Sequence, residues 1–215
     1  MIDFHTHTFL SDGELGPAEL VRRVEIRGFR AVGFADHVDN GTLEHTLPLL
    51  VRAARELSEA MTMKVLAGCE LTHCRPQHIA RLAARARELG AEVVICHGES
   101  PVEPVLAGTN RAAIEAGVDI LAHPGMITEA DAAEAARRGV LLEISGRRGH
   151  SLTNAHVAAT ALRVGAKLVF GSDAHAVSDF YDRAGAERVL LGAGLSAAQA
   201  AAAFANAETL SGLAV

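Results

Sequence analysis

Short apolar runs alternate with longer segments of helical composition along this chain, and this alternation is what most constrains its fold. The seven runs are almost continuously apolar, as expected of parallel strands that are buried on both faces. They are Ile2–Phe4, Ala31–Ala35, Val65–Cys69, Val93–Cys96, Ile120–Ala122, Val140–Ile144 and Leu168–Phe170. The segments rich in Ala, Leu, Arg and Glu are predicted to be helices. They cover about 17–27, 44–60, 77–89, 110–116, 129–138, 153–164, 183–191 and 196–205.

Glycines separate the two kinds of segment. Five of them follow a predicted helix and precede an apolar run, where a left-handed residue commonly ends a helix; they are Gly28, Gly90, Gly117, Gly139 and Gly165. The last predicted helix opens with Ser196 and Gln199, a capping-box pattern. Seven β/α units predict one α/β domain over residues 1–215, a TIM-like barrel one unit short of the common eightfold form. A flat, doubly wound parallel sheet is the alternative, which periodicity alone does not exclude.

Histidines and carboxylates follow the apolar runs. In a parallel barrel the carboxyl ends of the strands share one face, where such enzymes place their active sites. Nine candidates for metal binding lie at or just after these ends: His5, His7, Asp12, His37, Glu70, His97, His123, Asp173 and His175. Single polar residues at strand ends are commonly structural. A set this rich in histidine is not explained that way, because Ser, Asn and Thr serve equally well as helix caps.

The spacing of two pairs supports a metal site. His5 and His7 are two residues apart, so on an extended segment their side chains project to one side and can bind one ion. Asp173 and His175 repeat this spacing after the last run, which barrel closure would bring beside the first. We therefore predict a site for several metal ions.

Composition excludes several other classes of protein. The chain has a formal net charge of −6 and 49% hydrophobic residues, so neither disorder nor binding to nucleic acid through bulk basic charge is expected. Three cysteines without C-x-x-C spacing predict free thiols, which fit a reducing cytoplasm. No signal peptide and no apolar run long enough to span a bilayer is visible, so we expect no membrane partner.

The order of the polar motifs resembles that of the PHP family, named after polymerase and histidinol phosphatase domains. The motifs are His-x-His (5–7), Ser-Asp-Gly (11–13), Asp-His (36–37), Gly-x-Glu (68–70), His-Gly-Glu (97–99), Ala-His-Pro-Gly (122–125) and Ser-Asp-Ala-His (172–175). The resemblance runs from residue 2 to about 176. It implies a distorted (β/α)7 barrel and three divalent metal ions.

The resemblance also implies how the ligands are shared. Four residues would hold the first ion: His5, His7, Glu70 and Asp173. Asp12, His37 and His175 would hold the second ion. Glu70, His97 and His123 would hold the third, with Glu70 bridging. Mixed imidazole and carboxylate ligation suits zinc, manganese or iron, and the sequence does not choose among them.

Clustered divalent ions suit the hydrolysis of phosphate esters. They lower the pKa of a bound water toward about 7 and offset negative charge on the phosphoryl group. We therefore predict that a metal-bound hydroxide attacks a small-molecule phosphomonoester, with histidinol phosphate the substrate that the family name suggests. Asp12 is a candidate general acid for the leaving alcohol. Candidate contacts to the substrate phosphate are Arg147, Arg148, Asn154 and Arg111.

Three other functions stay open at this point. A phosphodiesterase acting on nucleotides or oligonucleotides is possible in spite of the acidic balance. A non-catalytic metal-binding module would be expected to lack some ligand motifs, and none is missing. An amidohydrolase also begins with His-x-His, but such sites often use a lysine at the end of a middle strand. Lys64 and Lys167 precede their runs and are predicted at the opposite end. The oligomeric state is not predicted.

Overall fold

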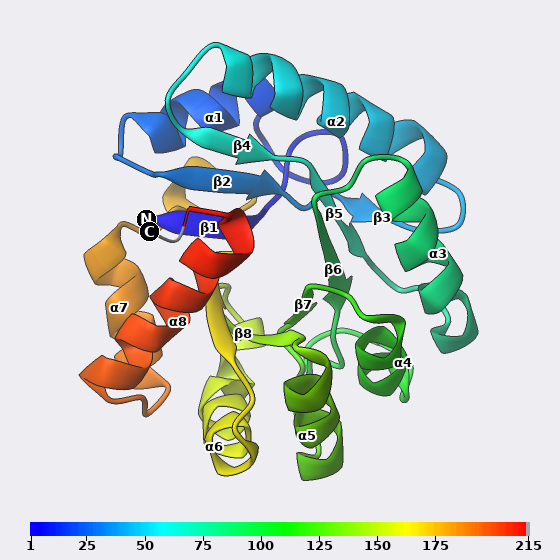
Figure 1. The fold of residues 1–215 in the computed structure, drawn as a ribbon, viewed down its shortest axis with the longest axis vertical. Coiled ribbons are helices and arrows are strands. Elements are labelled where there is room, and N and C mark those ends of the chain that lie inside the picture. The colour runs from blue at the N-terminus through cyan, green and yellow to red at the C-terminus, as the bar shows by residue number, and fades with distance from the viewer. Residues whose placement is uncertain (214–215) are drawn as a thin grey trace.

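The computed structural model describes residues 1–213, which form a single α/β domain with its strands inside and its helices outside (Figure 1). The strands are β1 (Ile2–Thr6), β2 (Ala31–Phe34), β3 (His37–Val38), β4 (Lys64–Leu66), β5 (Gly68–Leu71), β6 (Val93–His97), β7 (Ile120–Ala122), β8 (Leu141–Ser145) and β9 (Leu168–Gly171). The α-helices are α1 (Pro17–Glu25), α2 (Leu43–Glu59), α3 (Pro76–Glu88), α4 (Thr109–Ala116), α5 (Glu129–Arg138), α6 (Asn154–Val164), α7 (Arg183–Gly192) and α8 (Ala197–Ser211). Two 3₁₀ turns, η1 (His150–Thr153) and η2 (Val177–Asp179), follow β8 and β9.

All strand pairs are parallel, and they form two sheets. One sheet has the order β1-β2-β4 and the other β3-β5-β6-β7-β8-β9. Each of the seven apolar runs contains a strand, as predicted. At two of the seven places the chain forms two short strands instead of one, β2 followed by β3 and β4 followed by β5. At Gly68, where β5 begins, an added Cβ would lie 2.6 Å from the carbonyl oxygens of both Phe34 and Val93. Glycine is therefore required where the chain passes from one sheet to the other.

Hydrogen bonds join the end of the first strand to the segment after the last. The His7 amide donates to the Ala174 carbonyl at 2.8 Å, and the Ala174 amide donates to the His5 carbonyl at 3.2 Å. Thr6 and Ala174 form an isolated parallel bridge. These bonds place the His-x-His segment beside the Asp-x-His segment.

The helix ends follow the predicted glycine pattern, with one extension. All five predicted glycines have positive φ, and the capping box of Ser196 and Gln199 is present. Helix α8 was expected to end near residue 205 but continues to Ser211, where Gly212 ends it with φ of 71°. The added turns bury Ala207 and Ser211, so tertiary packing stabilises residues that weak amphipathicity did not reveal.

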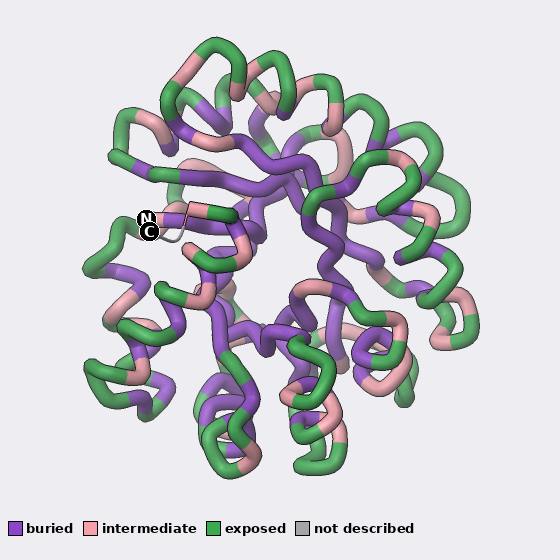
Figure 2. The backbone as a smooth tube through the Cα atoms, in the orientation of Figure 1, coloured by how far each residue is buried: buried purple, intermediate pink, exposed green. Residues whose placement is uncertain are grey.

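Buried residues concentrate in the strands and on the inner faces of the helices (Figure 2). The end of the strands opposite the polar motifs is covered in part by α8, where Asn206 donates to the Leu168 carbonyl and Lys64 donates to the Ser211 carbonyl. Lys64 therefore lies at the end away from the polar motifs, as expected. Among the helices of residues 1–213, none combines the length and apolar character needed to cross a membrane.

Candidate metal centre

The nine polar residues predicted to bind metal come together at the carboxyl ends of the strands. His7 Nε2 lies 3.3 Å from Asp173 Oδ1, and His5 Nε2 lies 3.5 Å from Glu70 Oε1. On the outer side of the cluster, His175 Nε2 lies 3.1 Å from Asp12 Oδ1. Residues from the first and last strands thus share one site, and the ligand atoms are spaced as atoms around common ions would be.

Four overlapping groups have potential ligand atoms that all lie within 4.8 Å of one another. They are His7–Asp12–His37–His175, His5–His7–Glu70, His5–His123–Asp173 and His97–His123–His150. The group around Asp12 contains the three residues expected at the second ion. The two groups that share His5 contain the four residues expected at the first ion. The last pairs the two histidines expected at the third ion with His150, while Glu70 Oε1 lies 3.5 Å from His123 Nε2.

Hydrogen bonds at Nδ1 orient several of these histidines. His5 Nδ1 donates to Glu143 Oε2 at 2.6 Å, and His97 Nδ1 donates to the Gly98 carbonyl at 3.0 Å. His37 Nδ1 lies 2.6 Å from the Thr72 hydroxyl, which can accept its proton. A proton fixed on Nδ1 leaves the Nε2 lone pair free, which is how histidine ligands are commonly held in metal sites.

The centre contains most of the buried polar atoms that lack a partner. In residues 1–213, nine buried side-chain nitrogen or oxygen atoms have no hydrogen-bond partner, and six belong to predicted ligands. These six are His5 Nε2, His7 Nδ1, His7 Nε2, Glu70 Oε1, His123 Nδ1 and His175 Nε2. Unpaired buried polar atoms are costly, so such a concentration fits residues that coordinate cations.

Electrostatics in the cluster are dominated by buried carboxylates facing imidazoles. Burial opposes a charge on His5, but Glu143, Asp173 and Glu70 outweigh it and hold the His5 pKa well above its usual value. Burial also disfavours a charged His37, yet Glu70 and Asp12 raise the His37 pKa to about 10. In the metal-free protein, protonated imidazoles therefore neutralise carboxylates that divalent ions would otherwise neutralise.

Two predicted ligands have unusual backbone conformations. Outside glycine, positive φ occurs in the described chain only at His73 (51°), His123 (26°) and Asp173 (54°). Such conformations cost about 1–3 kcal/mol each and concentrate at functional sites. The fold thus bears this cost at two of the residues that reach into the cluster.

The loop after β1 presents Asp12 to His37 and His175. Asp36 holds this loop in place, because its side chain accepts hydrogen bonds from the Thr8 amide, the Thr8 hydroxyl and the Ser11 hydroxyl. Burial raises the Asp12 pKa, but the facing imidazoles of His175 and His37 outweigh this effect and leave it below its usual value. Asp12 is therefore held as a carboxylate in the metal-free protein, a state that can bind a cation but cannot give up a proton.

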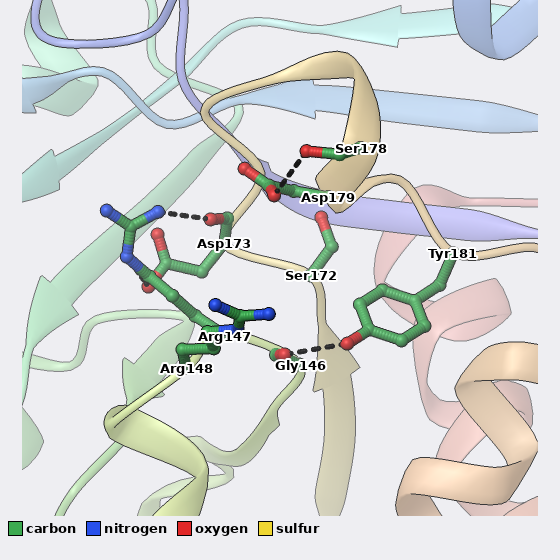
Figure 3. A pocket seen from close by; sticks show the side chains of 8 residues that line it. All are labelled: Gly146, Arg147, Arg148, Ser172, Asp173, Ser178, Asp179 and Tyr181. Atoms are coloured by element: carbon green, nitrogen blue, oxygen red, sulfur yellow. Dashed lines mark hydrogen bonds and ion pairs between the residues drawn. The ribbon is translucent and has the colours of Figure 1, made fainter.

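A cavity of about 550 Å³ opens beside the cluster (Figure 3). Its lining is Gly146, Arg147, Arg148, Ser172, Asp173, Ser178, Asp179 and Tyr181. Arg147 donates to the Asp173 carbonyl at 3.1 Å, and its Nη1 lies 2.7 Å from His175 Nδ1. Exposed Arg148 forms no ion pair or hydrogen bond with the rest of residues 1–213, so its guanidinium is available to an anion.

The other two residues predicted to contact substrate have structural partners instead. Asn154 is buried, accepts from the Ser145 amide and donates to the Ser145 carbonyl, so its amide group holds η1 and α6 against the end of β8. Arg111 lies on α4 and forms an ion pair with Asp131 of α5. The structure brings neither residue's polar group to the cavity.

Two residues of the cluster were not assigned a role by the sequence pattern. His150 comes from η1 after β8, and Glu103 comes from the loop after β6, with its carboxylate 3.2 Å from His97 Nε2. The sequence offered one signal for His150, which is its position in a loop on the active face of the predicted barrel. Neither residue follows its strand directly, so spacing along the chain did not place them.

Comparisons with known proteins agree with the motif order. The profile of the family described as the PHP domain matches residues 3–197. The uncharacterized protein MJ1295 of Methanocaldococcus jannaschii is 44% identical over 196 residues, which cover 90% of each chain.

Solved structures with similar folds are remote in sequence. A candidate histidinol phosphatase, hisK from Listeria monocytogenes, aligns with a TM-score of 0.58 and 11% identity over 84% of this chain and 97% of that one. A Xaa-Pro dipeptidase with bound methionine aligns with a TM-score of 0.65 and 12% identity, over 99% and 75%. The N6-methyl-AMP deaminase of Arabidopsis thaliana aligns with a TM-score of 0.54 and 16% identity, over 83% of this chain and 53% of that one. These likenesses support the fold, and the profile match together with the 44% identical relative shows that the chain belongs to the PHP domain family.

Proposed function

We propose that this chain is a metal-dependent phosphoesterase that hydrolyses a small phosphomonoester, and that residues 1–215 form one catalytic domain with a closed, distorted (β/α)7 barrel. The observation that carries this proposal is the convergence of nine family-motif residues on one rim, with six unpaired buried polar atoms, beside a cavity that contains two arginines. The relation to a candidate histidinol phosphatase makes histidinol phosphate the first substrate to test.

The residues present fit a set of divalent cations. We propose that His5, His7, Glu70 and Asp173 hold one ion and that Asp12, His37 and His175 hold a second. Glu70, His97 and His123 are proposed to contribute to a third. Zinc, manganese and iron suit this mixture of imidazole and carboxylate ligands. Such ions, when bound, supply a water of lowered pKa and offset charge on the phosphoryl oxygens.

The chain's own groups would bind and orient the substrate. Arg148 lines the cavity without a partner among residues 1–213 and can pair with a phosphoryl oxygen. Arg147 is tied to Asp173 and His175, so it shapes the border between the cavity and the cluster. We propose that Asp12 acts first as a metal ligand, and that a role as general acid would require a proton it does not hold in the metal-free state.

A second cavity, of about 410 Å³, lies at the Asp12 and His37 side of the cluster and contains His73 and Glu103. It offers space for a leaving group larger than a single alcohol. This observation keeps a nucleotide or short oligonucleotide diester as the second candidate substrate class. The acidic composition argues against long nucleic acids as partners.

The three cysteines are free and buried, and a cytoplasmic location stays a prediction from them.

Phosphate release tests the proposal directly. The metal-free protein is supplied separately with Mn²⁺, Zn²⁺ and Fe²⁺ and assayed against phosphomonoesters, including histidinol phosphate, and against phosphodiesters. We expect release from at least one monoester and at least about 100-fold less in a folded His37→Ala variant. Full metal loading without hydrolysis of any compound would favour a non-catalytic metal-binding module, and release from diesters alone would favour the second class.

A further inference from the structure

The last of the four groups of potential ligands contains a histidine outside the family motif pattern. Ligand atoms of His97, His123 and His150 lie within 4.8 Å of one another, and all three residues are buried. His97 and His123 were expected at a metal ion, but His150 was not. It comes from a different segment, the 3₁₀ turn η1 that follows β8.

His150 is held in one orientation by three neighbours. Its Nδ1 lies 2.6 Å from the hydroxyl of buried Ser100, which fixes one edge of the ring. Its ring stacks on that of His123 with centroids 4.0 Å apart and an interplanar angle of 16°. It meets His97 edge-on at 5.5 Å. The side chain is only 4% exposed, so this orientation is set by packing.

The local backbone explains why the imidazole turns inward. Gly149 has φ of 85°, a left-handed conformation that glycine adopts without strain. An added Cβ there would lie 3.2 Å from the Val102 side chain, so η1 packs closely on the loop after β6. This contact brings His150 next to Ser100, which belongs to the same loop.

The free nitrogen of His150 faces the carboxylates of the cluster. With Nδ1 against Ser100, Nε2 lies 3.4 Å from Glu103 Oε1 and 3.8 Å from Asp173 Oδ2. A hydroxyl can accept the Nδ1 proton, which leaves the Nε2 lone pair available to a cation. A buried histidine that only fills space would not need two carboxylates and two further imidazoles around that nitrogen.

We propose that His150 is a metal ligand that acts together with His97 and His123, and that Ser100 is the residue that positions it. The inference rests on the proposed metal dependence of the protein. It gives the third ion an imidazole beyond Glu70, His97 and His123. A nitrogen-rich set of three histidines is typical of zinc and other transition ions and poorly suited to magnesium.

Metal stoichiometry and affinity test this assignment without reference to turnover. Metal-free wild type, His150→Ala and His150→Gln are titrated with Zn²⁺ against a chromophoric chelator, and bound zinc is counted by mass spectrometry. We expect three ions in the wild type and more than about 100-fold weaker binding of one ion in both variants, beyond the effect usual for an outer-shell partner. His45→Ala removes an exposed histidine of α2, away from the cluster, and should leave all three affinities unchanged.

Ser100→Ala provides a second measurement in case the His150 variants do not fold. It should weaken one ion by about 10- to 100-fold, as loss of an orienting partner does. Folded His150 variants, or Ser100→Ala, that bind three ions with wild-type affinities would overturn the assignment and leave the phosphoesterase proposal standing. A wild type that binds no Zn²⁺, Mn²⁺ or Fe²⁺ would overturn both.

Discussion

The Nδ1 atom of His5 lies 2.6 Å from Oε2 of Glu143, and both side chains are buried, on strands β1 and β8. The carboxylate fixes the Nδ1 proton and raises the basicity of Nε2, the atom that faces Glu70. Glu143→Gln is therefore expected to preserve the fold and to lower Zn²⁺ affinity by about 10- to 100-fold. Competition titration measures this, with exposed Glu59→Gln as the control. Equal affinities in the two variants would show that Glu143 does not orient His5.

Gly171 leaves the space that the Glu143 carboxylate occupies. A Cβ at this position would lie 2.3 Å from Glu143 Oε2 and 3.1 Å from the His5 Cβ. We expect Gly171→Ala to lower the free energy of unfolding by about 1–3 kcal/mol, the usual cost of overpacking, and also to weaken metal binding. Urea unfolding of the metal-free protein and zinc titration measure the two effects.

Gly192→Ala is the matched control, because an added Cβ there meets no atom within 4 Å. At this position in α7 we expect the free energy of unfolding to be unchanged or raised by up to about 1 kcal/mol. If both alanine variants behave alike, the close approach of Gly171 to Glu143 has no energetic consequence.

The sequence predicted the strands and most of the cluster for a physical reason. Near-continuous apolar runs identify parallel strands that are buried on both faces, and ligands that directly follow such strands share one face whatever the loops do. His5 and His175 could therefore be placed near each other before their contacts were known. The splits at β2/β3 and β4/β5 were not visible, because they depend on the close approach of Gly68 to two neighbouring strands.

The residues that the sequence did not place belong to loops. His150 reaches the cluster from η1, where Gly149 lies close to Val102 and the His150 ring contacts Ser100, contacts between segments nearly fifty residues apart in the chain. Arg111 and Asn154 were reasonable candidates by position, but their polar groups are engaged with Asp131 and with the Ser145 backbone. Whether such a loop residue reaches the site depends on tertiary contacts, and the spacing of residues along the chain does not reveal those contacts.

The metal-free protein should lose stability as the pH rises above neutral. The His37 pKa is raised to about 10, because Glu70 and Asp12 outweigh the effect of burial. A histidine with a raised pKa contributes stability that is fully present below about pH 6.5 and is lost as the pH rises through the folded-state value of about 10. We therefore expect the wild type to lose more stability than His37→Gln between pH 6.5 and 10 in the presence of a chelator.

Bound metal should reverse this dependence. Imidazole must be deprotonated to bind an ion, so zinc affinity is expected to rise with pH over the range where His37 loses its proton. Thermal unfolding across this pH range, with and without zinc, measures both trends. If the metal-free wild type and His37→Gln follow the same pH profile, the ion pair between His37 and Glu70 does not contribute to folding.

Arg147 and Arg148 are neighbours with different partners, and this difference predicts different defects. Arg148 has no protein partner among residues 1–213, so Arg148→Ala should reduce kcat/KM for a phosphomonoester by about 10- to 150-fold, the loss of one charge-assisted hydrogen bond. The zinc affinity of Arg148→Ala should be unchanged.

Arg147 contacts Asp173 and His175, so Arg147→Ala should weaken zinc binding as well as turnover. Arg163→Ala, which removes a surface ion pair with Glu129, is the control for both measurements. Wild-type kcat/KM in Arg148→Ala would mean that the cavity beside Asp173 does not receive the substrate phosphate. Weakened zinc binding in that variant would contradict the separate roles of the two arginines.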